Sequence, residues 1–474
     1  MVAYGGMLLA DRLTGTLRAG TTPTTIWLFL LAMVGYAGLV AVVVRHPDVP
    51  SGFGSLLWVA PIGYRLLLLA TDPTLSDDVY RYLWDGHQIT QGINPYRYAI
   101  SAPEVDGFAI AARDLANNPD LASPYLPTNQ ALFAVLALVA PSVPLVIQVV
   151  MVGFELTAAV VLRRLLVLAD LPPSRVALFL WHPLAVVETA HSGHFDALLV
   201  LLTLVAFLAV HPDGLARGRL WSPVALALAT LTRPVPALVA PVFFWRWTWT
   251  QRFGFAAVGI ALMLPFRFGA GSWGLFGEPT GTGVFGSARV YSGEFRFNAV
   301  VAEQLERWMV SLTGNPDAFR PTAVGLIGVV LVGVLLAARP GVGPDPDSSA
   351  GFRRTLRLAM VPLAAYVLLT PVLHPWYLLL AVALAPFLVP TMDESRRWWF
   401  ALAPLGYLSG AVAVSYMTYI DPDAFGELVW VRRVEWWPTL ALLALGAAVV
   451  GGRGFGGLLR RDDDPIGRSD VNVA

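Results

Sequence analysis

The chain has 474 residues and a formal net charge of zero at pH 7; 56% of its residues are hydrophobic, 14% are charged, and its mean hydropathy is +0.63. Soluble domains carry about 25% charged residues, so this composition excludes a soluble enzyme and a disordered chain, and the balanced charge indicates no nucleic-acid partner. The sequence has no cysteine, which excludes disulfides, thiolate metal sites and a cysteine nucleophile. We therefore predict an all-α polytopic membrane protein.

Apolar segments of the length that a membrane helix needs recur along the chain. The predicted spans are 25–44, 54–70, 144–163, 174–190, 195–211, 221–232, 234–247, 253–268, 322–338, 357–372, 375–390, 398–418 and 434–451. A membrane span needs about 20 mainly apolar residues, and counting the segments of this kind predicts about 13 spans. Several are short or split by proline, which favours broken helices that line a cavity. The predicted organisation is an N-terminal segment 1–24, one transmembrane domain 25–452, and a disordered cytoplasmic tail 453–474.

Arginine clusters predict which connections face the cytoplasm. Basic residues are retained on the cytoplasmic side of a membrane protein, and alternate connections carry these clusters: Arg163, Arg164 and Arg175; Arg217 and Arg219; Arg246 and Arg252; Arg353, Arg354 and Arg357; Arg396 and Arg397. The remaining connections then face outward. Two of them are long, about 71–143 and 269–320, and loops of that size are usually functional.

The first outward loop begins with an acidic pair, Asp77 and Asp78. Ser76 before the pair predicts a helix N-cap, and the stripe that includes Tyr80 and Trp84 predicts an amphipathic helix at the membrane surface. The acids then have two interpretations. They complement the helix dipole, or they serve as a general base and its partner, because a neighbouring carboxylate raises basicity.

A second polar cluster follows Trp181-His182-Pro183 and Glu188, and it contains His191, His194 and Asp196. Three interpretations stay open: a metal site, hydrogen bonds to a substrate or its phosphate, and a structural role at the helix ends. We favour substrate binding and expect no metal ion and no other cofactor.

Arg233 lies between two short apolar segments, where an arginine is by default a functional candidate and its planar fork suits phosphate. A snorkelling side chain or a buried ion pair is the alternative. The polar and aromatic segment that ends at Asn298 suits a sugar or a lipid headgroup, and it suits a plain amphipathic strand equally well. His374, Trp376 and Tyr377 form a hairpin predicted on the same side as Asp77.

Taken in order, these motifs resemble the GT-C class of polyprenyl-phosphate-sugar glycosyltransferases, in particular its bacterial alpha-mannosyltransferase branch. The resemblance covers roughly residues 54–438. The motifs that carry it are Ser76–Gly86, Gly92–Tyr98, Trp181–Pro183 with Ser192–Ala197, Phe295–Asn298 and His374–Tyr377.

The resemblance implies a GT-C type bundle with two long extracytoplasmic loops, in a multi-pass protein of the bacterial cytoplasmic membrane. The donor would be a sugar, expected to be mannose, on a polyprenyl monophosphate, and the acceptor would be a hydroxyl of a glycan or glycolipid. Transfer would be inverting, with Asp77 as the base and Asp78 as the alternative. The substrate-binding residues would be Tyr80, Arg81, Trp84, His191, His194, Asp196, Arg233, Asn298, His374, Trp376 and Tyr377.

The chemistry agrees with this implication. A lipid-borne donor holds its sugar at the membrane boundary, where the acidic pair is predicted, and the leaving phosphate needs fixed donors or cations. A transporter or flippase of lipid-linked sugars is the competing hypothesis. Such proteins usually show internal repeats and ionisable residues at the midplane, and we find no convincing repeat.

Overall fold

The computed structural model describes residues 1–14, 18–46, 51–215, 220–267, 282–390, 398–420 and 427–451. Within these ranges the chain is helical and contains no strand, apart from one isolated parallel bridge between Phe297 and Val372. The predicted tail 453–474 lies outside the described residues. The all-α prediction is therefore confirmed for the described part of the chain.

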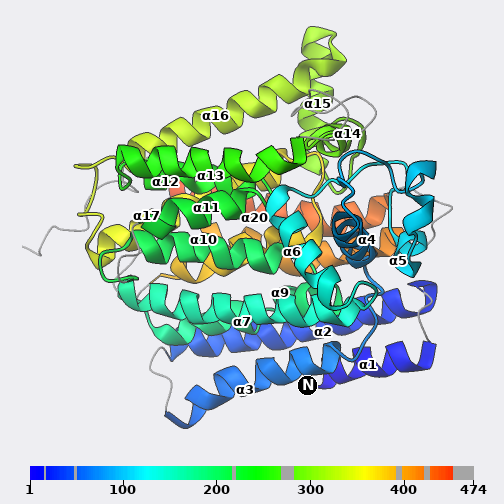
Figure 1. Ribbon diagram of the computed structural model, residues 1–474. Coiled ribbons are helices and arrows are strands. Elements are labelled where there is room, and N and C mark those ends of the chain that lie inside the picture. Colours follow the sequence, from blue (N-terminus) through cyan, green and yellow to red (C-terminus); the bar gives the residue numbers. More distant parts are fainter. Residues whose placement is uncertain are drawn as a thin grey trace, which may run out of the picture.

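Most of the long helices run along one common direction and form a bundle (Figure 1). They are α2 (Arg18–Arg45), α3 (Ser51–Leu68), α7 (Pro144–Leu168), α10 (Asp196–Val210), α11 (Trp221–Thr230), α13 (Trp249–Arg267), α16 (Phe319–Ala337), α17 (Ser349–Leu369), α19 (Trp398–Ala411) and α20 (Val429–Gly451). Three described helical segments are long and apolar enough to cross a membrane, namely Thr21–Arg45, Pro144–Leu168 and Pro316–Ala337. Six shorter apolar helical segments accompany them.

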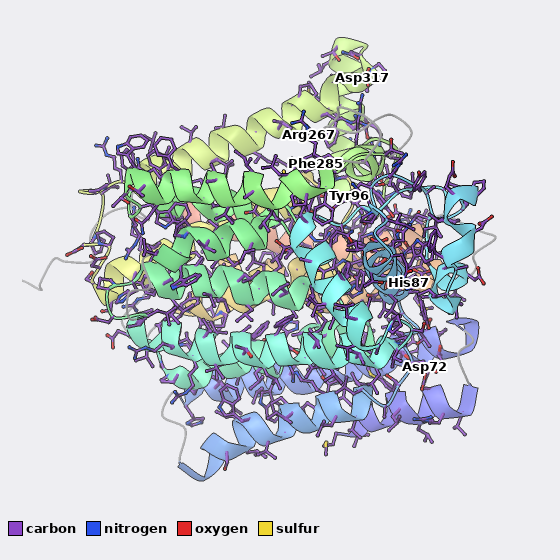
Figure 2. The ribbon with its side chains drawn as sticks, in the orientation of Figure 1. Asp72, His87, Tyr96, Arg267, Phe285 and Asp317 are labelled. Carbon is purple, nitrogen blue, oxygen red and sulfur yellow. The ribbon has the colours of Figure 1, made fainter. Side chains whose placement is uncertain are left out.

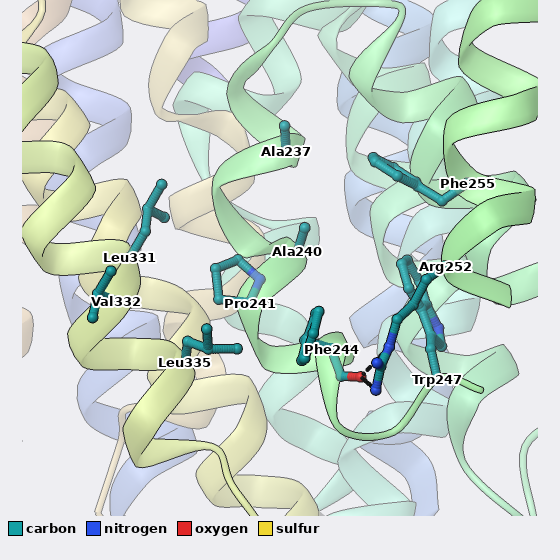
Figure 3. A pocket seen from close by; sticks show the side chains of 10 residues that line it. All are labelled: Ala237, Ala240, Pro241, Phe244, Trp247, Arg252, Phe255, Leu331, Val332 and Leu335. Atoms are coloured by element: carbon teal, nitrogen blue, oxygen red, sulfur yellow. Dashed lines mark hydrogen bonds between the residues drawn. The ribbon is translucent and has the colours of Figure 1, made fainter. Parts of the chain in front are cut away.

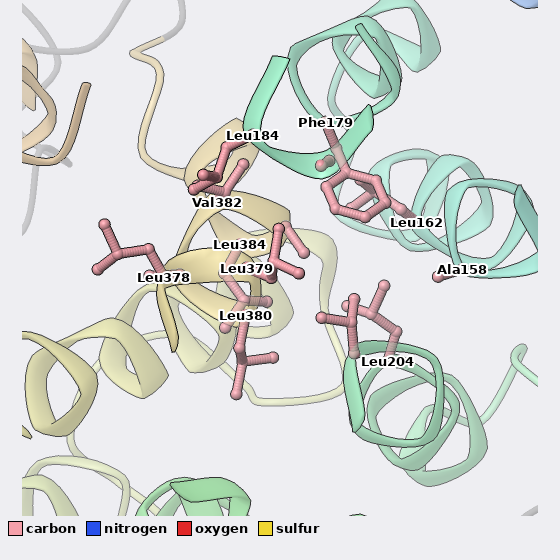
Figure 4. Close-up of a cluster of buried hydrophobic side chains, with 14 of the residues drawn as sticks. Ala158, Leu162, Phe179, Leu184, Leu204, Leu378, Leu379, Leu380, Val382 and Leu384 are labelled. Carbon is pink, nitrogen blue, oxygen red and sulfur yellow. The ribbon is translucent and has the colours of Figure 1, made fainter. Parts of the chain in front are cut away.

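The centre of the bundle is made of broken helices. Residues 173–191 form η2 (Pro173–Val176), α8 (Ala177–Leu180), α9 (Pro183–Val186) and the π-helix η3 (Val187–His191), and residues 375–387 form η7 (Pro375–Leu378), α18 (Leu379–Leu384) and η8 (Ala385–Phe387). Both segments are largely buried. Irregular backbone is tolerated at membrane depth only when protein or a wet cavity covers it. Figure 4 shows the packing, in which Leu379 and Leu384 lie among side chains from α7, α8 and α10.

The break predicted at Arg233 is also present. Helix α11 ends at Thr230, and the chain resumes as η5 (Val235–Val239) and α12 (Ala240–Phe244). Proline lacks a backbone N–H and cannot continue a helix interior, so Pro234 and Pro236 keep this stretch from becoming one straight span.

The structure contains helices that the span prediction did not include. Helix α1 (Val2–Thr14) occupies the predicted N-terminal segment, and the apolar helix α6 (Pro127–Val139) lies inside the predicted outward loop 71–143. Helix α17 begins at Ser349, ahead of the predicted 357, because Ser348 caps it by accepting a hydrogen bond from the Gly351 N–H at 3.1 Å.

The two long connections fold over one end of the bundle (Figure 1). The first supplies α4 (Asp78–Thr90), η1 (Pro103–Phe108), α5 (Ala111–Leu115) and α6, and the second supplies α14 (Gly286–Glu294) and α15 (Val300–Thr313). Figure 2 labels His87, Tyr96 and Phe285 at this end. The same end therefore receives the polar motifs of both connections.

Candidate active site

Helix α4 begins one residue later than predicted. Its first residue is Asp78 and its N-cap is Asp77, so the prediction that Ser76 caps the helix is wrong. Ser76 instead accepts a hydrogen bond from the Asp78 N–H at 3.3 Å in the preceding turn. The Asp77 carboxylate makes no capping hydrogen bond to the helix, which weighs against helix capping as the reason for this acid.

Asn117 joins the two carboxylates. Its side-chain Nδ2 donates to Asp77 Oδ1 at 2.9 Å and to Asp78 Oδ1 at 2.6 Å. One amide thus holds both acids in a fixed relation, although it lies about 40 positions later in the chain and comes from the loop that follows α5. Hydrogen bonds to charged groups are strong, so these two bonds offset the repulsion between the neighbouring carboxylates.

Arg81 holds that loop in place. Its guanidinium pairs with Asp85 one turn later at 3.1 Å and donates to the carbonyl oxygens of Asn117, Asn118 and Leu121. Arg81 is 1% exposed. We therefore propose that Arg81 positions Asn117, in place of the substrate contact expected from the sequence.

The rest of α4 is enclosed by protein and does not lie on a surface. Trp84 is fully buried in a small apolar cluster with Ile100 and Val105, and Tyr80 packs at the edge of the same cluster. Gly86 permits the close approach of α6, since a Cβ there would lie 2.2 Å from the Phe133 carbonyl oxygen. The apolar stripe of α4 therefore packs against other parts of the protein.

His191 anchors the segment that leads into the acids. Its Nε2 accepts from the Thr74 N–H at 3.3 Å, which leaves the proton on Nδ1, 2.7 Å from Thr71 Oγ1. The Thr71 hydroxyl in turn donates to the Leu68 carbonyl at 2.6 Å. Because protein groups occupy both ring nitrogens, we propose a positioning role for this histidine.

His194 reaches the acidic pair from the opposite side. Its Nδ1 lies 3.9 Å from Asp78 Oδ2 and 3.3 Å from the Tyr82 hydroxyl, and its Nε2 lies 3.3 Å from Glu188 Oε2. The turn that presents it needs Gly193 at a φ of 71°, a conformation that glycine adopts without strain. Glu188 lies on the π-helix, an element that often marks functional sites.

A stack of rings continues from His194. Trp376 lies on it at a ring-centroid distance of 3.8 Å, and His374 lies on Trp376 at 4.5 Å with an interplanar angle of 1°. Trp376 Nε1 and His374 Nδ1 are buried and have no hydrogen-bond partner among the described residues. Unsatisfied buried polar groups are costly, so these two nitrogens are candidates for contacts to a bound substrate.

Arg233 completes this side of the site. It pairs with Asp196 at 3.2 Å, and its guanidinium carbon lies 4.0 Å from the centroid of the Tyr377 ring. The side chain remains 15% exposed. The ion-pair alternative is thus present in the structure, yet the cation still borders the site.

Asn298 follows Phe297, whose ring stacks on His374. It adopts a φ of 51°, and its Oδ1 accepts from Trp436 Nε1 at 2.5 Å. Its Nδ2 interacts with the buried carboxyl of Glu435, also on α20. This amide therefore fixes the segment that carries Asn298 against α20.

Asp78 has an altered acidity. Burial and the neighbouring Asp77 charge raise the pKa of Asp78 to about 6, against the opposing effects of Asn117 and Arg233. Asp78 therefore gains its negative charge as the pH rises through about 6, and that charge acts on the neighbouring Asp77. No group of three or more acidic, histidine or cysteine side chains that could hold a metal ion occurs among the described residues.

Sequence reasoning missed the residues that connect these motifs. Asn117 lies in an ordinary polar turn, and Tyr82 lies within the apolar stretch of α4. Tyr416, which donates to Glu188 at 2.9 Å, comes from a predicted span. Nothing in their local sequence sets them apart. Only the fold brings them to the acids.

Comparison with known proteins agrees with this geometry. A family model described as "Alpha-(1->6)-mannopyranosyltransferase, N-terminal domain" matches residues 7–250, more than half of the chain. No curated protein and no solved structure matches. The match includes the acidic pair, the histidine cluster and Arg233. The chain therefore belongs to the alpha-(1→6)-mannopyranosyltransferase family and is a membrane mannosyltransferase.

Proposed function

We propose that this protein transfers mannose from a polyprenyl monophosphate to a hydroxyl of a glycan or glycolipid, with inversion, at the extracytoplasmic face of the membrane. The observation that carries the proposal is the acidic pair bridged by Asn117, with His194 beside Asp78 and the rings of Trp376 and His374 stacked behind it. The family description supports an alpha-(1→6) linkage.

In the proposed step, the acceptor oxygen forms a bond to the anomeric carbon while the bond from that carbon to the phosphate oxygen breaks. The bonding electron pair leaves with the phosphate, and the hydroxyl proton passes to a carboxylate. We assign that proton to Asp77 and a supporting role to Asp78, whose oxygens face Asn117, Tyr82 and His194. Asp78 then supports Asp77 by its charge.

The leaving phosphate needs positive charge or N–H donors that are in place before the reaction. Arg233 supplies a fixed cation. His374 and Trp376, whose ring nitrogens have no partner among the described residues, supply hydrogen-bonding groups near it. Holding both substrates in line contributes the remaining rate, since positioning alone is worth about 7–11 kcal/mol in favourable cases.

The test is transfer of radiolabelled mannose from polyprenyl-phosphate mannose to a lipid-glycan extract by the purified protein. We expect Asp77→Asn to lower the rate at least about 100-fold, the usual contribution of a positioned base. Asp114→Asn, an exposed acid in the same connection, is the matched control. Full activity of Asp77→Asn with loss in Asp78→Asn would move the base to Asp78. Absence of transfer from every polyprenyl-phosphate sugar would favour the flippase hypothesis.

Sidedness has its own experiment, because the chain lacks cysteine. A single cysteine at Asp114 should react with an impermeant maleimide in intact cells, whereas one at Arg163 should react only after lysis. The reverse pattern would place the site on the cytoplasmic face.

A further inference from the structure

An apolar groove lies away from the acidic pair, between α12, the beginning of α13 and α16 (Figure 3). Its volume is about 350 Å³, within the range of small-molecule sites. Its lining is apolar apart from one cation and consists of Ala237, Ala240, Pro241, Phe244, Trp247, Arg252, Phe255, Leu331, Val332 and Leu335. An apolar ligand or lipid chain fits such a lining.

Arg252 is the one charged residue of the lining. Its Nε and one terminal nitrogen both donate to the Phe244 carbonyl, at 3.0 and 2.6 Å, and the guanidinium lies over the rings of Phe244 and Trp249. No carboxylate of the described residues pairs with it. Nearby Arg246, by contrast, pairs with Asp347 at 2.8 Å. The groove thus ends at a fixed cation that lacks a counter-ion in the described part of the chain.

We propose that this groove binds an anionic phospholipid, with one acyl chain along the apolar lining and the phosphate on Arg252. The lining requires an apolar chain and the cation requires an anion, and a phospholipid supplies both in one molecule. Trp245 and Trp249 are 41% and 67% exposed at the same end. Such amphipathic rings favour the headgroup level of a bilayer, which places Arg252 at headgroup depth.

The reacting donor does not suit this position. Figure 1 places α12 at the end of the bundle remote from α4, whose first residue is Asp78. A polyprenyl phosphate held through its phosphate at Arg252 would keep its sugar far from the carboxylates. The groove is therefore a second lipid site, independent of the transfer reaction.

The test is native mass spectrometry of the full-length protein, with phosphatidylglycerol and phosphatidylcholine added separately. We expect phosphatidylglycerol to be retained preferentially and to raise the melting temperature, since a ligand bound only to the folded state stabilises it. Arg252→Gln, which keeps one donor for Phe244, should lower phosphatidylglycerol binding about five-fold, the factor expected of one basic side chain beside an anionic lipid. Ala240→Phe should fill the groove and abolish retention of both lipids.

Arg163→Gln, an exposed arginine of α7 outside the groove, is the matched control and should bind as the wild type does. The inference is overturned if Arg252→Gln retains phosphatidylglycerol unchanged, or if both lipids bind equally. Competition by sugar-free polyprenyl phosphate would overturn it in favour of a donor-lipid site. Because these readouts need no sugar transfer, they stand apart from the test of catalysis.

Discussion

Replacing Asn117 with alanine removes the amide that donates to both Asp77 and Asp78, at 2.9 and 2.6 Å. A hydrogen bond to a charged group is worth about 1.5–3 kcal/mol, and one unit of pKa corresponds to about 1.4 kcal/mol. Because Asn117 lowers the pKa of Asp78 and burial raises it to about 6, loss of the amide should raise that pKa by about one unit.

The assay is the pH profile of single-turnover mannose transfer between pH 5 and 9. Because Asp78 supports the base Asp77 only when it is ionised, the acid limb should move from about pH 6 in the wild type to about pH 7 in Asn117→Ala. At pH 6 the ionised fraction then falls from about one half to about one tenth, so the rate drops roughly five-fold, whereas above pH 8 it changes less than about two-fold.

The matched control is Ser101→Ala, which removes an exposed hydrogen bond to Asp120 in the same connection and should leave the acid limb unchanged. An equal loss of rate at every pH in Asn117→Ala would refute the reasoning. It would mean that the amide shapes the loop without influencing the ionisation of the acids.

Three further predictions concern other contacts of the site. The folded-state pKa of Asp78 is raised to about 6, so the protonated carboxyl stabilises the fold at low pH, and this stabilisation is lost as the pH rises through 6. Asp78→Asn should therefore raise the unfolding free energy at pH 8 by up to about 3 kcal/mol and leave it little changed at pH 4. Thermal melting at both pH values checks this, and an equal shift at both would contradict it. The double variant Arg233→Gln with Asp196→Asn, which avoids leaving one buried charge alone, should raise KM for the donor about ten-fold or more and leave KM for the acceptor unchanged, a split worth about 1.4 kcal/mol; equal effects on both substrates would remove Arg233 from the phosphate site. Gly86→Ala places a Cβ 2.2 Å from the Phe133 carbonyl oxygen and should lower the unfolding free energy by about 1–3 kcal/mol, whereas the control Gly63→Ala, whose Cβ would meet nothing within 4 Å, should not. Equal melting temperatures of the two variants would contradict this prediction and show that α6 moves away from α4 at little cost.

The sequence by itself determined the class of the protein and indicated candidate residues for its chemistry. Apolar segments with few charges have no stable alternative to helices in a bilayer, because every backbone polar group must be satisfied internally. The acidic pair and Arg233 were identifiable because charge near apolar segments is costly without a purpose. These are local properties, and a sequence carries them directly.

The tertiary structure alone decided which residues lie together. Asn117 donates hydrogen bonds to both acids, and Arg81 points inward and holds the loop that carries Asn117. Both ring nitrogens of His191 form hydrogen bonds with threonines. The apolar stripe of α4 predicted a membrane surface but packs within the protein, since burial by protein and burial by lipid select the same residues. A periodic pattern predicts that one face of a helix is apolar, but only the tertiary structure shows whether protein or lipid covers that face.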